Sequence, residues 1–167
     1  MSNSKILFVK QIILAILETI EIQCERKYIA DKNSESVDYN NPELRVSGVI
    51  GVTSEYFNGS VSLIFTKCAF LDIMEGMLGE EYEEIDDDLI DGCAELLNIA
   101  YGTVKKKLNE QGYKIAMAIP TVVHGEKLKF KQAGSDPAVI VPFHREGKSF
   151  LVTINFENKN EKELLNA

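Results

Sequence analysis

The chain contains no tryptophan, and only four prolines, three cysteines and two histidines among its 167 residues. The cysteines, Cys24, Cys68 and Cys93, are odd in number and show no CxxC spacing. They therefore form neither a disulfide framework nor a zinc site. Because free cysteine is usually a buried residue, we expect the three thiols in or near the core. Free thiols indicate a reducing compartment, so we expect a cytoplasmic protein.

Basic residues are also few, with 18 Lys and Arg against 26 Asp and Glu and a formal net charge of −8. Sequence-independent binding to nucleic acid or to an anionic membrane needs clustered Lys and Arg, so we expect neither. The most apolar segment, Ile6 to Ile22, is interrupted at Lys10, Gln11 and Glu18. A membrane span needs roughly 20 mostly apolar residues. We therefore predict a largely buried helix there, with no membrane insertion.

The remaining pattern predicts a single α+β domain over residues 1–167, with a polar tail from about residue 158. Two long helices and a short one are expected to pack on a mainly antiparallel sheet. The helices are predicted at about residues 5–25, 67–77 and 86–111, and the strands at 44–53, 59–66, 113–124, 138–145 and 149–156. A long helix followed by a hairpin-containing segment occurs twice, which indicates two pseudo-related halves.

Several turn signals separate these segments. Asn58-Gly59 predicts a hairpin turn, Gly79 a helix C-cap, and Glu146-Gly147-Lys148 a second hairpin. Polar residues at 31–42 and 131–137 indicate loops.

An acidic stretch precedes the second long helix, with seven carboxylates in the nine residues from Glu80 to Asp88. A calcium loop of the EF-hand type would need a central glycine and a ligand spacing that are missing here. Carboxylates before a helix stabilise its positive N-terminal end, and we favour that interpretation.

The second long helix carries two rows of residues. An apolar row predicted to face the core contains Leu89, Cys93, Leu96, Leu97, Ala100 and Val104. A polar row contains Asp91, Glu95, Asn98, Gly102 and Lys105, at i, i+4, i+7, i+11 and i+14. Asn and Gly are poor helix formers, and their place on one row indicates a functional surface. Spacing alone leaves an ordinary solvated face open as the alternative.

The motif Asp91-x3-Glu95-x2-Asn98 is followed by Gly102 and Lys105, then by Pro120-Thr121-Val122-Val123 and Gly125. Further motifs lie upstream, at Ser47 to Gly51, Gly59 to Val61 and Met77 to Glu81. The order of these motifs resembles that of the CheC/CheX family of chemotaxis phosphatases. CheC-like members carry two such helices. The first helix here has Glu18 and Glu21 but no matching Asn, so the pattern is CheX-like.

The resemblance implies hydrolysis of the aspartyl phosphate on a CheY-like receiver domain. Asn98 is the candidate for orienting the attacking water, because a neutral amide can both donate and accept. Glu95 would pair with a basic residue of the receiver, Gly102 would allow close approach, and Lys105 would contact the partner. Asp91 either contacts the partner or supports the helix start. The chain itself would hold no cofactor or metal, because Mg²⁺ would lie in the receiver.

The same helix could serve a non-catalytic module that binds a receiver domain or a flagellar-switch component. The resemblance also implies a homodimer formed through sheet edges; the alternating row from Phe150 to Phe156 suits such an edge or an ordinary core strand. His124 and His144 are expected to be unrelated surface residues rather than a catalytic pair.

Overall fold

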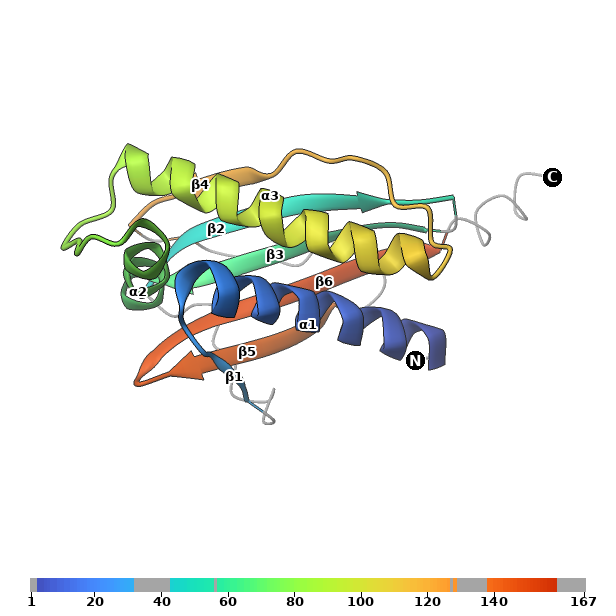
Figure 1. The fold of residues 1–167 in the computed structure, drawn as a ribbon, viewed down its shortest axis with the longest axis horizontal. Helices are drawn as coiled ribbons and strands as arrows, with labels where there is room; N and C mark the ends of the chain where they lie inside the picture. The colour runs from blue at the N-terminus through green and yellow to red at the C-terminus, as the bar shows by residue number, and fades with distance from the viewer. Residues whose placement is uncertain (1–2, 32–42, 56, 127, 129–137, 159–167) are drawn as a thin grey trace.

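The computed structural model describes residues 3–31, 43–55, 57–126, 128 and 138–158. The elements follow in the order α1 (Asn3–Cys24), β1 (Ile29–Ala30), β2 (Leu44–Thr53), β3 (Phe57–Thr66), α2 (Lys67–Leu78), α3 (Asp87–Glu110), β4 (Thr121–His124), β5 (Val139–Arg145) and β6 (Lys148–Asn158). The strands form one antiparallel six-stranded sheet in the order β1-β5-β6-β3-β2-β4. The helices α1 and α3 lie side by side over one face of this sheet (Figure 1). The predicted α+β class is therefore confirmed.

The two halves of the chain repeat one plan. In the sheet, β3 and β6 pair at the centre, each beside its own hairpin partner, β2 and β5. Each half then supplies a short edge strand to the other, because β1 pairs with β5 and β4 pairs with β2. The strand order is unchanged, read from the opposite edge, when each element is exchanged for its counterpart: α1 with α3, β1 with β4, β2 with β5 and β3 with β6. The two halves thus share one continuous sheet and one core.

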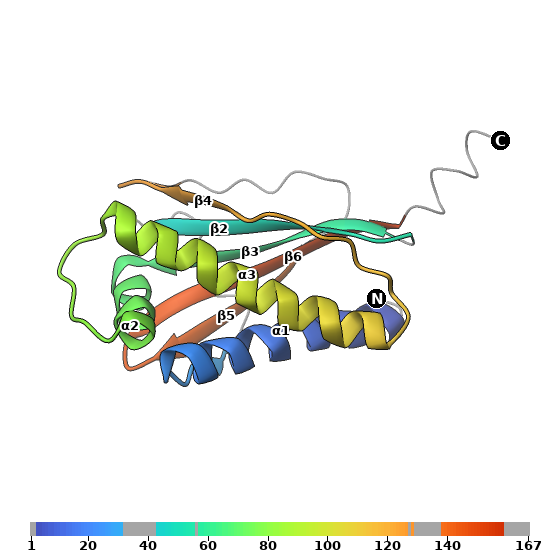
Figure 2. The same cartoon turned by 45° about the horizontal axis from the view of Figure 1, so that its top comes forward.

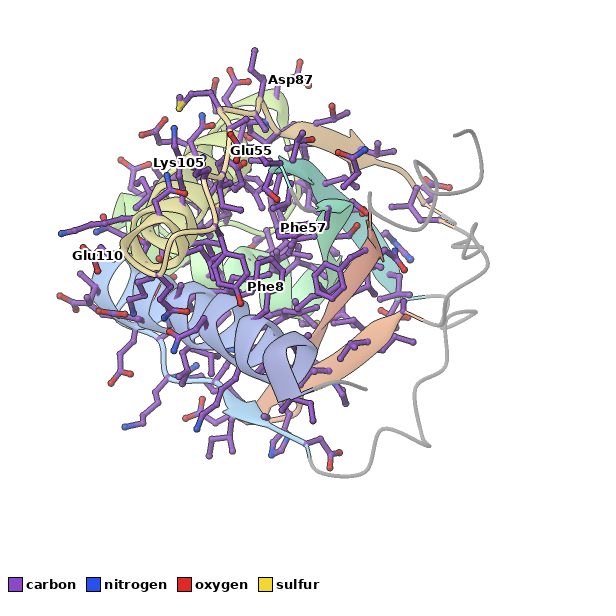
Figure 3. All side chains as sticks on the ribbon, turned by 90° about the vertical axis from the view of Figure 1, so that its right-hand side faces the viewer. Phe8, Glu55, Phe57, Asp87, Lys105 and Glu110 are labelled. Atoms are coloured by element: carbon purple, nitrogen blue, oxygen red, sulfur yellow. The ribbon has the colours of Figure 1, made fainter. Side chains whose placement is uncertain are left out.

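The main core fills the space between the helices and one face of the sheet (Figure 2). Phe8 of α1 and Phe57 of β3 meet there edge to face, with ring centroids 4.7 Å apart (Figure 3). The opposite face of the sheet carries a smaller buried cluster of Leu44, Ile64 and Leu151. This second cluster explains why Ile64 interrupts the polar alternation of its strand. None of the helices in the described ranges combines the length and apolar character that crossing a membrane requires.

The predicted hairpin between β2 and β3 is confirmed, but its turn does not lie at Asn58-Gly59, because both residues are inside β3. The reversal begins at Ser54, whose backbone N–H donates to Phe57 O at 3.0 Å and whose hydroxyl accepts from Phe57 N at 3.2 Å. Gly59 is needed for a different reason. A Cβ there would lie 2.2 Å from the carbonyl oxygen of Asn155 on the neighbouring strand.

The predicted strand over residues 113–124 is too long, since only Thr121–His124 pairs with β2. The preceding segment contacts both α3 and the end of β2. The Tyr101 hydroxyl donates to Ala116 O at 2.8 Å, and the Asn109 side chain accepts from Ile115 N at 2.5 Å. The backbone N–H of Ala116 donates to Thr53 O of β2 at 2.8 Å. These bonds stand in place of the longer ladder that the sequence pattern suggested.

Strand β6 lies inside the sheet between β3 and β5. The alternating row from Phe150 to Phe156 therefore belongs to a core strand and cannot form a dimer edge. The hairpin that leads into it is confirmed, with Glu146 and Gly147 both at positive φ. The loop predicted at 131–137 and the tail after residue 158 lie outside the described residues, as does the loop at 31–42 apart from Asp31.

The expectation for the thiols is right for two of the three cysteines. Cys24 and Cys93 are buried, and burial raises the pKa of Cys93 to about 12. Cys68 is exposed near the start of α2, which corrects its expected place in the core.

Candidate active site

Helix α3 has well-defined start and stop signals. Asp86 is the N-cap, and its carboxylate accepts from Leu89 N at 2.9 Å. Asp87 and Asp88 lie in the first turn and Lys107 in the last, where each charge opposes the helix dipole. The acidic stretch thus contributes to the helix start, as predicted. Within the described residues no group of three or more His, Cys, Asp and Glu side chains could hold a metal ion.

The position of α3 on the sheet depends on a glycine in β2. A Cβ at Gly48 would lie 2.2 Å from Cδ1 of the buried Leu97, so any larger residue there would displace this leucine from the strand. Val122 of β4 pairs with Gly48, and Gly125 N donates to Arg45 O at 3.0 Å. Three motifs far apart in the sequence therefore meet where α3 crosses the β2–β4 edge of the sheet.

The five residues of the predicted polar row lie together on the outward side of α3. Asp91, Glu95, Asn98 and Gly102 are exposed and Lys105 is half-buried. The apolar row is buried, and Tyr101 and Leu108 extend it. Figure 3 looks nearly along α3 and shows Lys105 on the outside of the helix. The division into a core face and a polar face is therefore as predicted.

The polar row is chemically available. Within the described residues the side chains of Asp91, Glu95, Asn98 and Lys105 form no hydrogen bond or ion pair, whereas the nearby Lys107 pairs with Glu18 of α1. Beyond the neighbouring backbone of α3, a Cβ at Gly102 would meet no atom of the described residues within 4 Å, so packing among these residues does not require glycine there. Such a surface can present an amide and a carboxylate, one helical turn apart, to another molecule.

The two histidines do not form a pair. His124 lies on β4 and His144 on β5, with β2, β3 and β6 between these strands. At roughly 4.8 Å per strand spacing they are about 19 Å apart across the sheet. Both are exposed. The prediction of two unrelated surface histidines is confirmed.

Comparison with known proteins identifies the family. A sequence profile of the family described as "Chemotaxis phosphatase CheX" matches residues 46–144, which contain the motifs of β2, α3 and β4. The chain belongs to the CheX family. It is 33% identical over 87 residues to the "CheY-P phosphatase CheX" of Thermotoga maritima, and the alignment covers 52% of this chain and 56% of that relative. The chain thus spans about half the length of the curated relative that it matches.

Solved structures of CheX proteins share the whole fold. CheX from Vibrio vulnificus is 27% identical, with a TM-score of 0.80 over 90% of this chain and 99% of that one. A CheX–CheY complex with BeF₃ and Mg²⁺ from Borrelia burgdorferi gives a TM-score of 0.74 over 90% of this chain and 97% of that one, at 22% identity. The latter likeness concerns the fold alone. The CheX-like pattern inferred from the motifs is confirmed.

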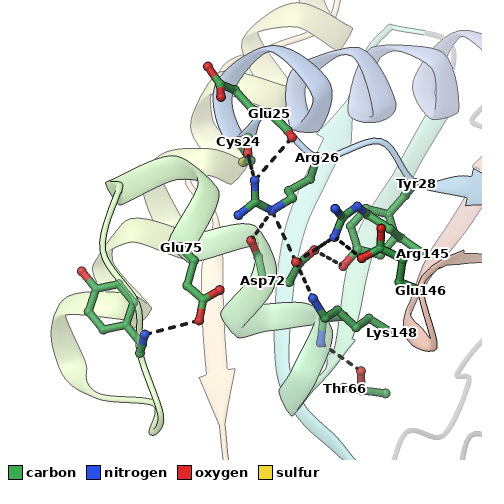
Figure 4. Close-up of polar contacts among 12 residues, drawn as sticks. Cys24, Glu25, Arg26, Tyr28, Thr66, Asp72, Glu75, Arg145, Glu146 and Lys148 are labelled. Carbon is green, nitrogen blue, oxygen red and sulfur yellow. Dashed lines mark hydrogen bonds and ion pairs between the residues drawn. The ribbon is translucent and has the colours of Figure 1, made fainter.

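Sequence reasoning missed a buried ionic cluster that joins α2 to the segment after α1 and to the β5–β6 turn (Figure 4). Asp72 of α2 is 3% exposed, and its carboxylate accepts from Lys148 at 2.6 Å, Arg145 at 2.9 Å and Tyr28 at 3.0 Å. Arg26 adds an ion pair at 3.3 Å. Burial alone would raise the pKa of Asp72, but the hydrogen bonds and charges of its partners outweigh burial and hold that pKa below its ordinary value. The available signal was a lone carboxylate on the apolar side of a predicted helix.

Proposed function

We propose that this CheX-family chain hydrolyses the aspartyl phosphate of a phosphorylated CheY-like receiver domain. The observation that carries the proposal is the outward row of α3, where Glu95 and Asn98 are exposed and unpaired within the described residues. Fully solvated helix faces favour Glu, Lys, Gln and Arg, whereas this row places Asn and Gly at mid-helix. The name of the Thermotoga relative supports the same reaction.

Asn98 is proposed to position the attacking water. In the reaction, the water oxygen forms a bond to phosphorus while the bond between phosphorus and the aspartyl oxygen breaks, which releases a carboxylate and inorganic phosphate. The water also gives up a proton to the products or solvent. Most of the rate gain in such a transfer comes from alignment and electrostatics. An amide can orient the water without changing its own charge, which suits this role.

Glu95 is proposed to fix the docking register. It lies three residues before Asn98 and therefore about 4.5 Å away along the helix axis. An exposed carboxylate at that distance can pair with a basic side chain that lines the phosphorylated pocket of a receiver. Gly102 leaves room for the receiver backbone, and Asp91 and Lys105 would lie at the rim. Mg²⁺ is placed on the receiver rather than on this chain.

We further propose that two copies of the chain associate through the β4 edge. Within the described residues, β4 pairs with β2 alone and ends the sheet. Two large apolar side chains are exposed at this edge, Ile119 at 89% and Val123 at 46%. Edge strands with exposed apolar residues are prone to pair with another chain. The reaction itself is assigned to the cytoplasm, which suits free thiols.

The decisive experiment measures the decay of a phosphorylated receiver domain with and without this protein. We expect Asn98→Ala to lower kcat by about 10²-fold, by analogy with the loss of one positioned polar group in other active sites. Glu95→Ala should mainly raise KM. Asn58→Ala is the matched control, since Asn58 is an exposed amide on β3. If wild type and Asn98→Ala leave the receiver with the same lifetime, the role proposed for Asn98 is wrong. If that lifetime also equals the one without protein, the chain is a binding module.

A further inference from the structure

The outward face of α3 separates its charges by sign. Four exposed carboxylates, those of Asp87, Asp88, Asp91 and Glu95, occupy the N-terminal half. The C-terminal half of the same face carries Lys105 and Lys106, and the uncharged Asn98 and Gly102 lie between the two groups. At 1.5 Å per residue, Asp91 and Lys105 are about 21 Å apart along the axis.

Helix stability does not explain this separation. The helix dipole favours acidic residues in the first turn and basic ones in the last, and Glu95 and Lys105 lie beyond those turns. Asp91 and Glu95 are like charges at i and i+4, an arrangement that destabilises a helix by a few tenths of a kcal/mol. A stable solvated helix would place a lysine four residues after a glutamate. Apart from Glu110 in the last turn, the carboxylates of α3 precede Lys105 and Lys106, and the side chains of these two lysines have no partner within the described residues.

We propose that Lys105 and Lys106 form an electrostatic docking pair for the anionic surface around the phosphorylated aspartate of the receiver. This inference rests on the proposed function. With Asn98 at the phosphoryl group, the two ammonium groups lie about two helical turns further along the same face. The phosphoryl group and the carboxylates that bind its metal give that side of the receiver a negative potential. Side chains as long as lysine bring their charge within a Debye length of it, about 8 Å at physiological ionic strength.

The separation also gives the receiver one direction of docking along α3. If the receiver were reversed, its anionic surface would face Asp88, Asp91 and Glu95, and like charges opposed across an interface disfavour the complex. In the proposed direction, that surface faces the lysines and a more basic part of the receiver faces the carboxylates. Lys105 and Lys106 are thus positioning residues that act before the chemical step.

The test is the double charge reversal Lys105→Glu with Lys106→Glu, assayed on a phosphorylated CheY-like receiver. Rim charges act mainly on the rate of association, so we expect KM to rise about tenfold while kcat changes by less than about twofold. The KM of wild type should rise with ionic strength, and that of the variant should change less. The matched control is Lys10→Glu with Lys27→Glu, which changes the net charge equally on exposed positions of α1 and the segment after it. A KM equal to that of this control would overturn the proposal.

A binding measurement separates this inference from the proposed function. The probe is the receiver loaded with BeF₃⁻ and Mg²⁺, titrated by calorimetry into wild type and the two double variants. If the wild-type protein binds the probe through the lysines but does not speed phosphate loss, the phosphatase proposal fails and the docking pair stands. If phosphate loss is fast and the lysine variant binds like the control, the docking pair is wrong and the phosphatase proposal stands.

The direction of docking along α3 can be measured by photo-cross-linking. A photo-cross-linking residue placed at Asp88 or at Lys106 should attach to different segments of the receiver, on opposite sides of its phosphorylated aspartate. Attachment of both probes to the same segment would contradict a fixed direction.

Discussion

At the scale of single residues, Gly102 is the most informative member of the polar row. It lies at mid-helix, where glycine costs about 1 kcal/mol relative to alanine. Apart from neighbouring atoms of α3 itself, no atom of the described residues lies within 4 Å of the place where its Cβ would be, so packing does not offset this cost. A partner that approaches the helix backbone at this point provides a physical reason to keep glycine.

Replacing Gly102 should stabilise the fold and weaken the binding of the receiver. Gly102→Ala should raise the free energy of unfolding by about 0.5–1 kcal/mol, measured by urea denaturation, because the helix gains and nothing is displaced. The same change should raise the KM for the phosphorylated receiver, and Gly102→Leu should raise it further. A Gly102→Leu variant with wild-type KM would show that the receiver does not approach here.

At the scale of elements, α3 is held in place by contacts with three other parts of the chain. Leu97 sits on Gly48 of β2, Tyr101 binds the segment after α3 through Ala116 O, and Lys107 pairs with Glu18 of α1. These contacts fix the rotation of α3, so the polar row faces outward and stays accessible. The catalytic candidates need not move to meet a partner, which reduces the cost of docking.

A substitution beside β4 tests the proposed dimer. Ile119→Lys should shift the protein from dimer to monomer in sedimentation velocity, because the new charge would be buried between two edges. Ile22→Lys is the matched control, since Ile22 is 65% exposed on α1. A protein that sediments as a monomer before any substitution would refute the proposed dimer, as would an Ile119→Lys variant that remains dimeric.

At the scale of the whole molecule, the Asp72 cluster joins parts of the chain that are distant in sequence. Arg26 and Tyr28 follow α1, Arg145 and Lys148 flank the β5–β6 turn, and Asp72 comes from α2. Buried ionic groups are costly when a partner is lost, because the remaining charge stays desolvated. Here the cations are 25–31% exposed at their side chains, so water can partly replace the carboxylate.

Asp72→Asn should lower the free energy of unfolding at pH 7 by roughly 2–3 kcal/mol. The folded state holds the pKa of Asp72 below its unfolded value, so the ionised carboxylate stabilises the fold above about pH 4, and this contribution is lost as the pH falls through the folded pKa. The difference in free energy of unfolding between wild type and Asp72→Asn, measured by urea denaturation, should therefore narrow as the pH falls from 5 to about 3. Asp91→Asn, an exposed control, should stay within about 0.5 kcal/mol of wild type. A gap that stays constant down to pH 3 would contradict the assignment.

The sequence alone determined the local features of this protein. Helical periodicity separated the buried row from the polar row of α3, caps placed its ends, and the order of motifs indicated the CheX family, because each of these signals depends on neighbours along the chain. Tertiary structure decided what depends on distant segments. It moved the β2–β3 turn away from Asn58-Gly59, shortened β4, exposed Cys68 and placed β6 inside the sheet. It also brought Gly48 under Leu97 and gathered three cations around Asp72, since packing between segments that lie far apart in the chain leaves no periodic signal in the sequence.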